Sequence, residues 1–581
     1  MNLLAPDVRA PAPDVRAPAR PATRTAWAWA CVAAGLAVTG LRWWAARDRR
    51  EYTLWPDEPA QLAIARFVGG GTHWTMRNQS IWRPGYGTLL GPVYAATDDP
   101  HHVFRAAMAL NAVLGGIAAV LLVLLAKRLT AFGPLGGALA AVGVAATPAL
   151  LFPTGFVWSE SLIAPLYLGT VIALLAFWEA PGRGRGLALA ALCGAGFVTH
   201  SRLLPLALVT VLLVALAWER RRIGRADAAV VVGGLLAALL AASRYAAFVT
   251  ARVWDDPSER NSLSGVIDQF ADPVAIGVAA VGQVWYLLAG SLGLIALAVA
   301  EVLDRRRPGG RPPGAYVVVA LATVAQVALS VVFMAGRERP DQVVYGRYND
   351  IVVAPLLLLA IACLAGRARS PWSRRRLAAA LAGAAVATIG LGALVALVRA
   401  DQLGAGNGLE PMILALQPFV DGRPAIPVMR ITVLALCVAA LLVAGAATRR
   451  RWVLVGVFAV LLGVGVTRTE DVLNRGWNGS GGLERVALLA EPGAPLERGA
   501  PVDYYLPAAS NNTGRLMLYQ WYLPDSDFTV VAHPLARASS AYVFADLKTP
   551  ILTEAGAEVV WRDPLKPVGL WLRPTAPARP G

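Results

Sequence analysis

Residues 103–126 read VFRAAMALNAVLGGIAAVLLVLLA, an apolar run with one charged residue, Arg105, and with Lys127–Arg128 directly after it. An α-helix needs roughly 20 such residues to cross the hydrocarbon core of a bilayer. Comparable apolar runs recur along most of the chain, near 25–46, 103–126, 134–152, 161–178, 186–200, 203–218, 227–249, 278–300, 315–335, 351–366, 377–398, 430–447 and 452–467. Because 186–200 and 203–218 form either one broken helix or two short ones, the sequence predicts a polytopic α-helical membrane protein with eleven to thirteen spans.

The overall composition excludes a soluble enzyme. Of the 581 residues, 56% are hydrophobic and 15% are charged, whereas a soluble globular chain carries roughly 25% charged residues. The net charge of +16 comes mainly from arginines in short clusters between the apolar runs, so membrane orientation explains it better than nucleic-acid binding does. The four cysteines all lie within apolar runs and indicate no disulfide framework.

The basic clusters predict the orientation of the chain. With thirteen spans, every cluster falls on one side of the membrane, which is the cytoplasm by the positive-inside rule. The clusters are Lys127–Arg128, Arg183/Arg185, Arg220–Arg222 with Arg225, Arg305–Arg307 with Arg311, Arg367/Arg369 with Arg374–Arg376, and Arg449–Arg451. We therefore expect a disordered cytoplasmic tail at 1–24, a transmembrane domain at 25–467 with an outer loop at 47–102, and an extracytoplasmic C-terminal domain at 468–581.

The C-terminal segment is long enough for a small α/β domain. Alternating or aromatic-rich runs there suggest strands, and one further run suggests a helix. The expected strands are LMLYQWYL (516–523), FTVVAH (528–533), AYVFADL (541–547), EVVWRD (558–563) and GLWLRP (569–574), and the expected helix is ERVALLA (484–490).

The outer loop opens with an acidic pair, in Tyr52-Thr53-Leu54-Trp55-Pro56-Asp57-Glu58-Pro59. A carboxylate at the lipid–water boundary can act as general base on a hydroxyl within hydrogen-bond reach. The alternative is a helix N-terminus, with Asp57 capping AQLAIARFV and Glu58 in its first turn. Both interpretations can hold at once.

The rest of this loop suggests two short helices lying on the membrane. It contains Arg83-Pro84-Gly85-Tyr86-Gly87 and then Asp98-Asp99-Pro100-His101-His102. The two histidines beside two aspartates suggest a metal, but neighbouring residues on a helix diverge and no third ligand is marked. No cofactor is expected, and a divalent metal is unsupported.

Ionisable residues also mark the outer ends of later spans, where they are functional candidates by default. Each has a structural alternative, since Glu160 can cap a helix, Arg202 can reach for headgroups and the tyrosines can belong to an aromatic belt. Together, an acid near the first span and arginines near later ones suit transfer from a lipid phosphate. The candidates at these later spans are Glu160, Arg202, Arg337, Tyr345, Arg347 and Tyr348.

These motifs resemble the GT-C superfamily of membrane glycosyltransferases, in particular the branch of protein O-mannosyltransferases and the lipid A aminoarabinose transferase. The matching motifs are Pro56-Asp57-Glu58, Ser159-Glu160, Ser201-Arg202, and Gly346-Arg347-Tyr348 followed by Pro355. The resemblance covers most of the chain in order and topology. It is specific for the superfamily and not for the substrate.

The resemblance implies an inverting hexosyl- or pentosyltransferase at the outer face of the plasma membrane. The donor would be a polyprenyl-phosphate sugar, and the acceptor a hydroxyl of a glycan, lipid or protein. Asp57 would be the catalytic base, with Glu58 and Glu160 as further catalytic candidates that orient acceptor or sugar. Arg347 and Tyr348 would bind the donor phosphate with help from Arg202, and Arg83, Arg337 and Tyr345 are further substrate-binding candidates.

Two other classes of protein remain open at this stage. A transporter or flippase of lipid-linked or anionic solutes predicts internal repeats and mid-membrane charges, whereas here no half-to-half repeat is found and the charges gather at one face. A catalytically inactive membrane scaffold of the same fold predicts that Asp57 is dispensable.

The predicted topology has a direct test. A reporter fused after Arg311 should be active only in the cytoplasm, and one fused after Gly581 only outside, because the intervening spans place these sites on opposite faces. The opposite result at either point would show that the span count is wrong.

Overall fold

The computed structural model describes most of the chain outside the N-terminal tail and several connections. The described residues are 23–50, 57–71, 74–76, 82–254, 272–303, 314–335, 343–366, 374–398, 412–420, 426–447, 451–476, 486, 489, 494–497, 499–506, 514–535, 540–563 and 567–573.

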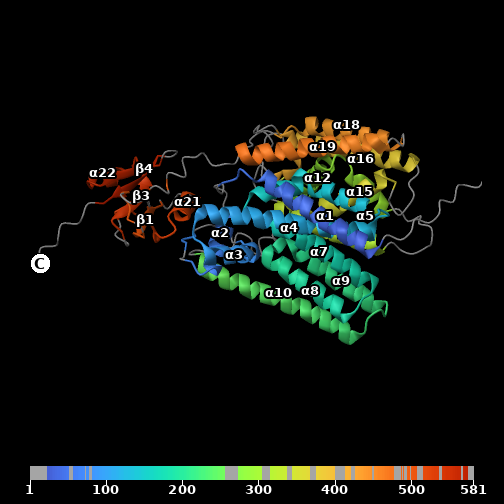
Figure 1. The fold of residues 1–581 in the computed structure, drawn as a ribbon, viewed down its shortest axis with the longest axis horizontal. Coiled ribbons are helices and arrows are strands. Elements are labelled where there is room, and N and C mark those ends of the chain that lie inside the picture. Colours follow the sequence, from blue (N-terminus) through green and yellow to red (C-terminus); the bar gives the residue numbers. More distant parts are fainter. Residues whose placement is uncertain are drawn as a thin grey trace, which may run out of the picture.

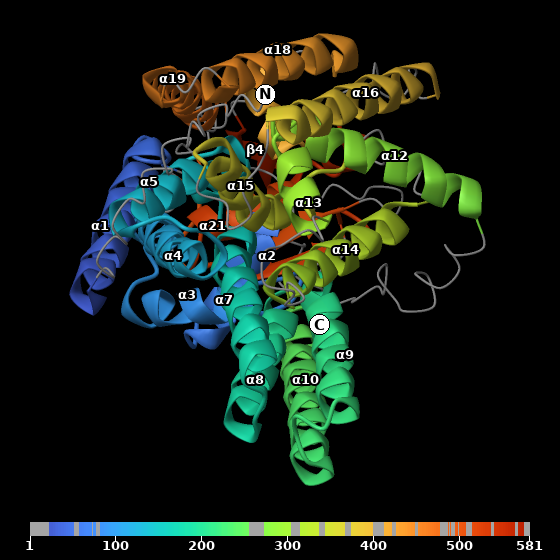
Figure 2. The same cartoon turned by 90° about the vertical axis from the view of Figure 1, so that its right-hand side faces the viewer.

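A described helix covers each of the thirteen apolar runs, so the polytopic helical class is confirmed. Figure 1 shows the helices running side by side, with the C-terminal domain at one end of the bundle. In Figure 2, α8, α9 and α10 extend to one side of α4, α7 and α15, and α16, α18 and α19 lie on the other. The helices are α1 (Arg24–Ala45), α4 (Pro100–Leu129), α5 (Pro134–Ala145), α6 (Pro148–Leu151), α7 (Glu160–Glu179), α8 (Arg183–Thr199), α9 (Leu204–Glu219), α10 (Arg225–Val253), α12 (Pro273–Gly290), α13 (Ile295–Leu303), α14 (Gly314–Met334), α15 (Asp350–Leu364), α16 (Arg374–Val398), α18 (Val428–Ala447) and α19 (Arg451–Asp471).

The expected number of spans is too high for the described residues. Eight helices are long and apolar enough to cross a membrane, or nine if the pair α5 and α6, bent by 72°, is counted as one span. The helix α8 has 17 residues and α15 has 15, short of the roughly 20 that hydrocarbon requires. Because α15 is buried on nearly all sides, protein rather than lipid surrounds its apolar side chains.

Local chemistry explains where the apolar runs break. The run 186–200/203–218 forms two helices, α8 and α9, because His200 has an extended backbone and a short 3₁₀ turn follows at Ser201–Leu203. The run 278–300 divides into α12 and α13 at Gly293, whose φ of +73° is a left-handed conformation that glycine adopts readily.

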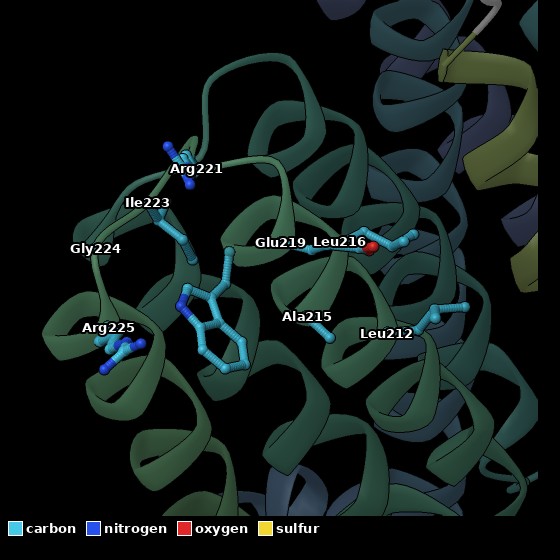
Figure 3. A pocket seen from close by; sticks show the side chains of 9 residues that line it. Leu212, Ala215, Leu216, Glu219, Arg221, Ile223, Gly224 and Arg225 are labelled. Atoms are coloured by element: carbon cyan, nitrogen blue, oxygen red, sulfur yellow. The ribbon is translucent and has the colours of Figure 1, made fainter.

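One predicted cytoplasmic cluster can be located on the structure. Arg221 and Arg225 lie at the turn between α9 and α10, on the rim of an open hollow whose floor includes Leu212 and Leu216 (Figure 3). Arg220 and Arg222 lie over the ring of Trp178, at 5.3 and 5.7 Å. Cations above apolar side chains at a helix end suit a membrane interface, and the cytoplasmic assignment stays a prediction.

The outer loop contains the two short helices that the sequence suggests, α2 (Asp57–Val68) and α3 (Gly85–Ala96). They pack on each other and lie at the same end of the bundle as the C-terminal domain (Figure 1). The side-chain amide of Gln520 pairs with the backbone of Thr75, accepting from its N–H at 2.7 Å and donating to its carbonyl at 3.2 Å. Arg66 of α2 also donates to the Pro524 carbonyl at 2.9 Å. These bonds connect the outer loop to the C-terminal domain.

The C-terminal domain is a small mixed sheet with the strand order β2-β1-β3-β5-β4. Strands β1 (Val502–Tyr505), β2 (Phe528–Val531) and β3 (Tyr542–Asp546) are parallel, whereas β5 (Val568–Leu572) runs antiparallel to β3 and to β4 (Glu558–Arg562). Two helices, α21 (Gly514–Tyr522) and α22 (Pro550–Glu554), connect the strands.

One expected strand of this domain is wrong. LMLYQWYL forms helix α21, because a crossover between the parallel strands β1 and β2 is needed there and a helix supplies it. The four other expected strands are present, and β1 was missed. The expected helix ERVALLA lies mostly outside the described residues.

Candidate active site

Asp57 lies in the first turn of α2 and joins two distant segments of the chain. Its Oδ2 is 2.5 Å from Nη1 of Arg347, and its Oδ1 accepts a hydrogen bond from the Trp82 indole at 2.9 Å. The side chain is 21% exposed, so one face of this carboxylate is open. Asp57 and Glu58 thus lie in the first turn of a helix, as the structural alternative expects, and the role of Asp57 as a base stays a prediction.

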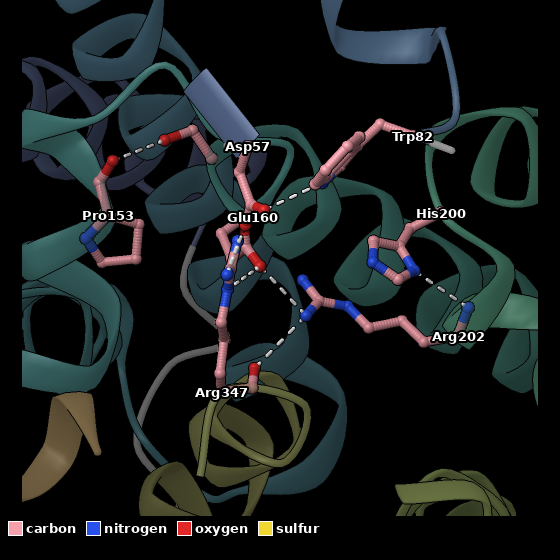
Figure 4. Close-up of polar contacts among 8 residues, drawn as sticks. Asp57, Trp82, Pro153, Glu160, His200, Arg202 and Arg347 are labelled. Carbon is pink, nitrogen blue, oxygen red and sulfur yellow. Dashed lines mark hydrogen bonds and ion pairs between the residues drawn. The ribbon is translucent and has the colours of Figure 1, made fainter. Parts of the chain in front are cut away.

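Glu160, the first residue of α7, holds two guanidinium groups. Its Oε1 accepts from Nε of Arg347 at 2.6 Å and from Nη1 of Arg202 at 3.1 Å. Arg202 also donates to the Arg347 carbonyl at 3.4 Å. Figure 4 shows these side chains pointing toward one another. We call Asp57, Glu160, Arg202 and Arg347 the ion-pair cluster; two carboxylates and two guanidinium groups make it neutral.

Arg347 lies in the segment before α15 and stays positively charged. Burial by itself lowers the pKa of this guanidinium, but Asp57 and Glu160 outweigh it and raise the pKa well above its usual value. The guanidinium carbon lies 4.3 Å from the centre of the Trp158 ring, a cation–π contact that supports the same charge state.

Arg202 follows the break between α8 and α9. His200 accepts the Arg202 backbone N–H at 3.1 Å, and burial together with the positive Arg202 lowers the pKa of His200 well below its usual value. The imidazole therefore stays neutral. Nε and Nη2 of Arg202 are buried and have no hydrogen-bond partner in the described part of the chain, so these two nitrogens, with three N–H groups, remain for a ligand.

The predicted aromatic residues form one wall beside the cluster. The Tyr348 ring lies 5.1 Å from the Arg202 guanidinium carbon and 5.0 Å from the Tyr345 ring. His200 and Phe333 complete the group, with ring centres 5.5 and 5.3 Å from Tyr348.

Glu58 does not face the cluster. It is fully buried, and its Oε1 accepts the Val157 backbone N–H at 2.9 Å. This bond ties α2 to the segment that leads into Glu160, so Glu58 orients Asp57 and Glu160 relative to each other.

Of the remaining predicted residues, Arg83 packs its guanidinium on the Phe197 ring at 4.1 Å, and its positive charge helps to lower the pKa of His200. Arg337 lies outside the described residues. His102 and Asp99 form the N-terminal turn of α4, where Asp99 accepts the His102 backbone N–H at 2.7 Å. Within the described ranges, no group of three metal-ligating side chains is present.

Sequence reasoning missed two contacts of the cluster. Trp82 orients Asp57, and Trp158 lies against Arg347. Both tryptophans stand next to a quoted motif, beside Arg83 and Ser159, but an aromatic residue at a membrane boundary is common and its partner is not visible in the sequence.

Helices that converge on a buried ion-pair cluster, with a small mixed-sheet domain at the C-terminus, define this chain as a polytopic helical membrane protein. Its fold is similar to that of ArnT from Cupriavidus metallidurans. The structure of ArnT bound to undecaprenyl phosphate matches with a TM-score of 0.53 at 18% identity, covering 95% of this chain and 99% of that one. The apo structure matches with a TM-score of 0.51 at 17% identity, covering 94% and 98%.

A weaker match is the arabinosyltransferase EmbB from Mycobacterium smegmatis, with a TM-score of 0.44 at 17% identity over 76% of this chain and 40% of that one. No family model and no curated protein matches the sequence. The two ArnT structures confirm the fold that the sequence resemblance led us to expect.

Removing the Glu160 charge should destabilise the protein strongly. Glu160→Gln leaves two buried guanidinium groups without their shared carboxylate, and breaking a buried ion pair costs about 3–5 kcal/mol. Thermal unfolding of the purified protein in detergent measures the loss. The matched control is Glu179→Gln, which removes a 3.1 Å surface pair with Arg128 and should cost at most about 1 kcal/mol. Equal effects of the two variants would contradict the structural role of Glu160.

Proposed function

We propose that this protein transfers a sugar from a polyprenyl-phosphate donor to an acceptor hydroxyl at the outer face of the plasma membrane. The observation that carries the proposal is the direct contact of Asp57 with Arg347. A base and a phosphate-binding cation thus share one site, in a fold whose relative ArnT is described bound to undecaprenyl phosphate. The N-terminus would be cytoplasmic and the C-terminal domain extracytoplasmic.

Asp57 acts as the general base. The acceptor hydroxyl gives its proton to the Asp57 carboxylate as its oxygen attacks the anomeric carbon. The bond from that carbon to the phosphate oxygen breaks, and its electron pair leaves with the polyprenyl phosphate. Attack opposite the phosphate inverts the anomeric centre, so one base suffices and no covalent intermediate forms.

The two arginines receive the phosphate. Arg202 offers two nitrogens that have no hydrogen-bond partner in the described part of the chain, and a guanidinium can bind phosphate oxygens in a bidentate manner. When the phosphate also takes Nη1 of Arg347, it replaces Asp57 there and frees Oδ2 for the acceptor hydroxyl. Donor binding therefore both neutralises the leaving group and releases the base.

Glu160 and Glu58 act by position in this scheme. Both are buried; Glu160 accepts from the Arg347 guanidinium, and Glu58 accepts from the Val157 backbone N–H. Glu160 sets the distance between the two guanidinium groups, and Glu58 sets the approach of α2. Preorganised charges of this kind need no rearrangement at the moment of reaction.

Asp57→Asn should lower kcat for sugar transfer by about 10²–10⁴-fold, the usual contribution of a general base, with little change in thermal stability. The assay supplies membranes with a panel of radiolabelled prenyl-phosphate sugars and measures label in the acceptor fraction. Asp98→Asn is the matched control, because it removes an outer-loop carboxylate that pairs with Arg66 at 3.2 Å. Full activity of Asp57→Asn would refute the proposed base. Label that crosses the membrane without reaching an acceptor would favour the transporter.

Arg347→Lys should raise the KM for the lipid donor more than it lowers kcat. Lysine keeps the charge but cannot make the two bonds that Nε and Nη1 make now. Losing one charged hydrogen bond corresponds to a roughly 10- to 100-fold rise in KM. Arg128→Lys, at a surface pair, is the control. If KM and kcat are both unchanged, Arg347 has no part in donor binding.

A further inference from the structure

A second cluster of charged side chains lies behind the ion-pair cluster. A cavity of about 10 Å³ is enclosed there by residues of α1, α6, α7 and α15 and the segments beside them. Four ionisable residues line it: Arg347 of the ion-pair cluster, and Arg42, Glu160 and Asp350, which are 2%, 5% and 3% exposed. Glu160 thus belongs both to the ion-pair cluster and to this cavity.

In each of the side chains of Arg42, Glu160 and Asp350, at least one polar atom forms a hydrogen bond and another has no hydrogen-bond partner among the described residues. Arg42 donates from Nη2 to the Leu150 carbonyl, Glu160 Oε1 accepts from the two arginines, and Asp350 Oδ1 accepts from the Tyr286 hydroxyl at 2.8 Å. By contrast, Nε of Arg42, Oε2 of Glu160 and Oδ2 of Asp350 are buried without a hydrogen-bond partner among the described residues. An unsatisfied buried polar atom costs about 1–3 kcal/mol, so three around one small cavity call for a shared partner.

The chemistry of these atoms selects the partner. Nε of Arg42 is a donor, Oε2 of Glu160 is a carboxylate acceptor, and Oδ2 of Asp350 is a carboxyl oxygen. The guanidinium groups of Arg42 and Arg347 repel a metal cation, and the Glu160 carboxylate repels an anion. The volume matches a single water-sized sphere, and a buried water needs two to four polar partners. A water molecule accepts one hydrogen bond from Arg42, donates one to Glu160 and makes a third with the Asp350 carboxyl group, which satisfies all three atoms.

We propose that Arg42, Glu160 and Asp350 hold one buried water molecule, and that this water connects the Arg42 guanidinium to the two acidic side chains. The water links α1, α7 and α15 behind the site, so Arg42 and Asp350 are positioning residues for Glu160. The assignment rests on local geometry and is independent of the proposed transfer reaction.

A glycine of α4, Gly115, leaves the space that the Arg42 side chain occupies on its way to the cavity. A Cβ added to Gly115 would lie 2.1 Å from Cδ and 2.2 Å from Nε of Arg42, far inside van der Waals contact. Only glycine leaves room at this point for the Arg42 side chain to pass. The close approach places the guanidinium at the cavity despite the cost of burying a charge.

The first test is a high-resolution map of the full-length protein. A single spherical density should lie between the three atoms, at hydrogen-bond distances of about 2.7–3.2 Å from each. An empty cavity at a resolution that shows other buried waters would overturn the proposal, as would a density bound to only one of the three residues.

The second test is a double-mutant cycle in thermal unfolding, which needs no knowledge of the substrate. Arg42→Leu and Asp350→Leu should each lower Tm, since each removes one of the three partners of the water and leaves the others incompletely hydrogen-bonded. The double variant should lose clearly less than the sum of the two shifts. Arg42→Gln with Asp350→Asn repeats the cycle if the leucine variants do not fold.

The control cycle pairs Asp350→Leu with Thr432→Val. Thr432 accepts a hydrogen bond from Trp285 at 2.9 Å and does not line the cavity, so these two shifts should add. Additive shifts in the Arg42–Asp350 cycle would overturn the water-mediated connection, whether or not the protein transfers sugars.

Discussion

The buried contact of Arg347 with both Asp57 and Glu160 is the interaction on which the rest of this structure depends. Taking these charges out of water is costly, and the cost is offset only by short, well-aligned bonds with each partner. The contact therefore constrains three segments at once: the start of α2, the start of α7 and the segment before α15. A shift of any one of them by a fraction of a bond length would leave a buried charge unpaired.

The fold meets this constraint by bringing helix N-termini together. Asp57 and Glu160 lie in the first turns of their helices, where the helix dipole stabilises a negative charge. The arginines come from the connections between α-helices, Arg202 from the short 3₁₀ turn at Ser201–Leu203 and Arg347 from the turn before α15. Arg202 reaches the cluster because the chain breaks between α8 and α9, and Arg347 because it lies just before α15. Carboxylates on rigid elements and cations on connections give a precise but accessible site.

A neutral cluster of this type is well suited to binding an anion by exchange. In the free protein, Asp57 occupies Nη1 of Arg347 and the positive charge is satisfied. A phosphate oxygen can replace Asp57 without leaving an arginine unpaired at any stage. Asp57 is partly exposed whereas Glu160 is buried, so in the proposed reaction the exchange takes place at Asp57. The buried water that we propose would hold Glu160 from behind while this exchange takes place.

Several features of the site and fold follow from single stretches of sequence. The quoted motifs around Asp57, Glu160, Arg202 and Arg347 name the four residues of the ion-pair cluster, because a charge at the end of an apolar run is costly and needs a reason. Other features were predicted wrongly or missed because the sequence does not show which segments will be neighbours in the fold. LMLYQWYL has the composition of a strand and becomes a helix because it must connect two parallel strands. Arg42, inside the first apolar run, gives no local sign of the cavity it lines.

The sequence by itself determined the many-pass helical class, the position of most apolar helices, and the residues whose charge requires a partner. These properties depend on composition and on neighbours within one turn of helix. Which carboxylate pairs with which arginine, and which helices lie in protein rather than lipid, was decided only by the tertiary structure. The physical reason is that the cost of a buried charge is local, whereas its compensation comes from atoms hundreds of residues away along the chain, and no local pattern records where those atoms will be.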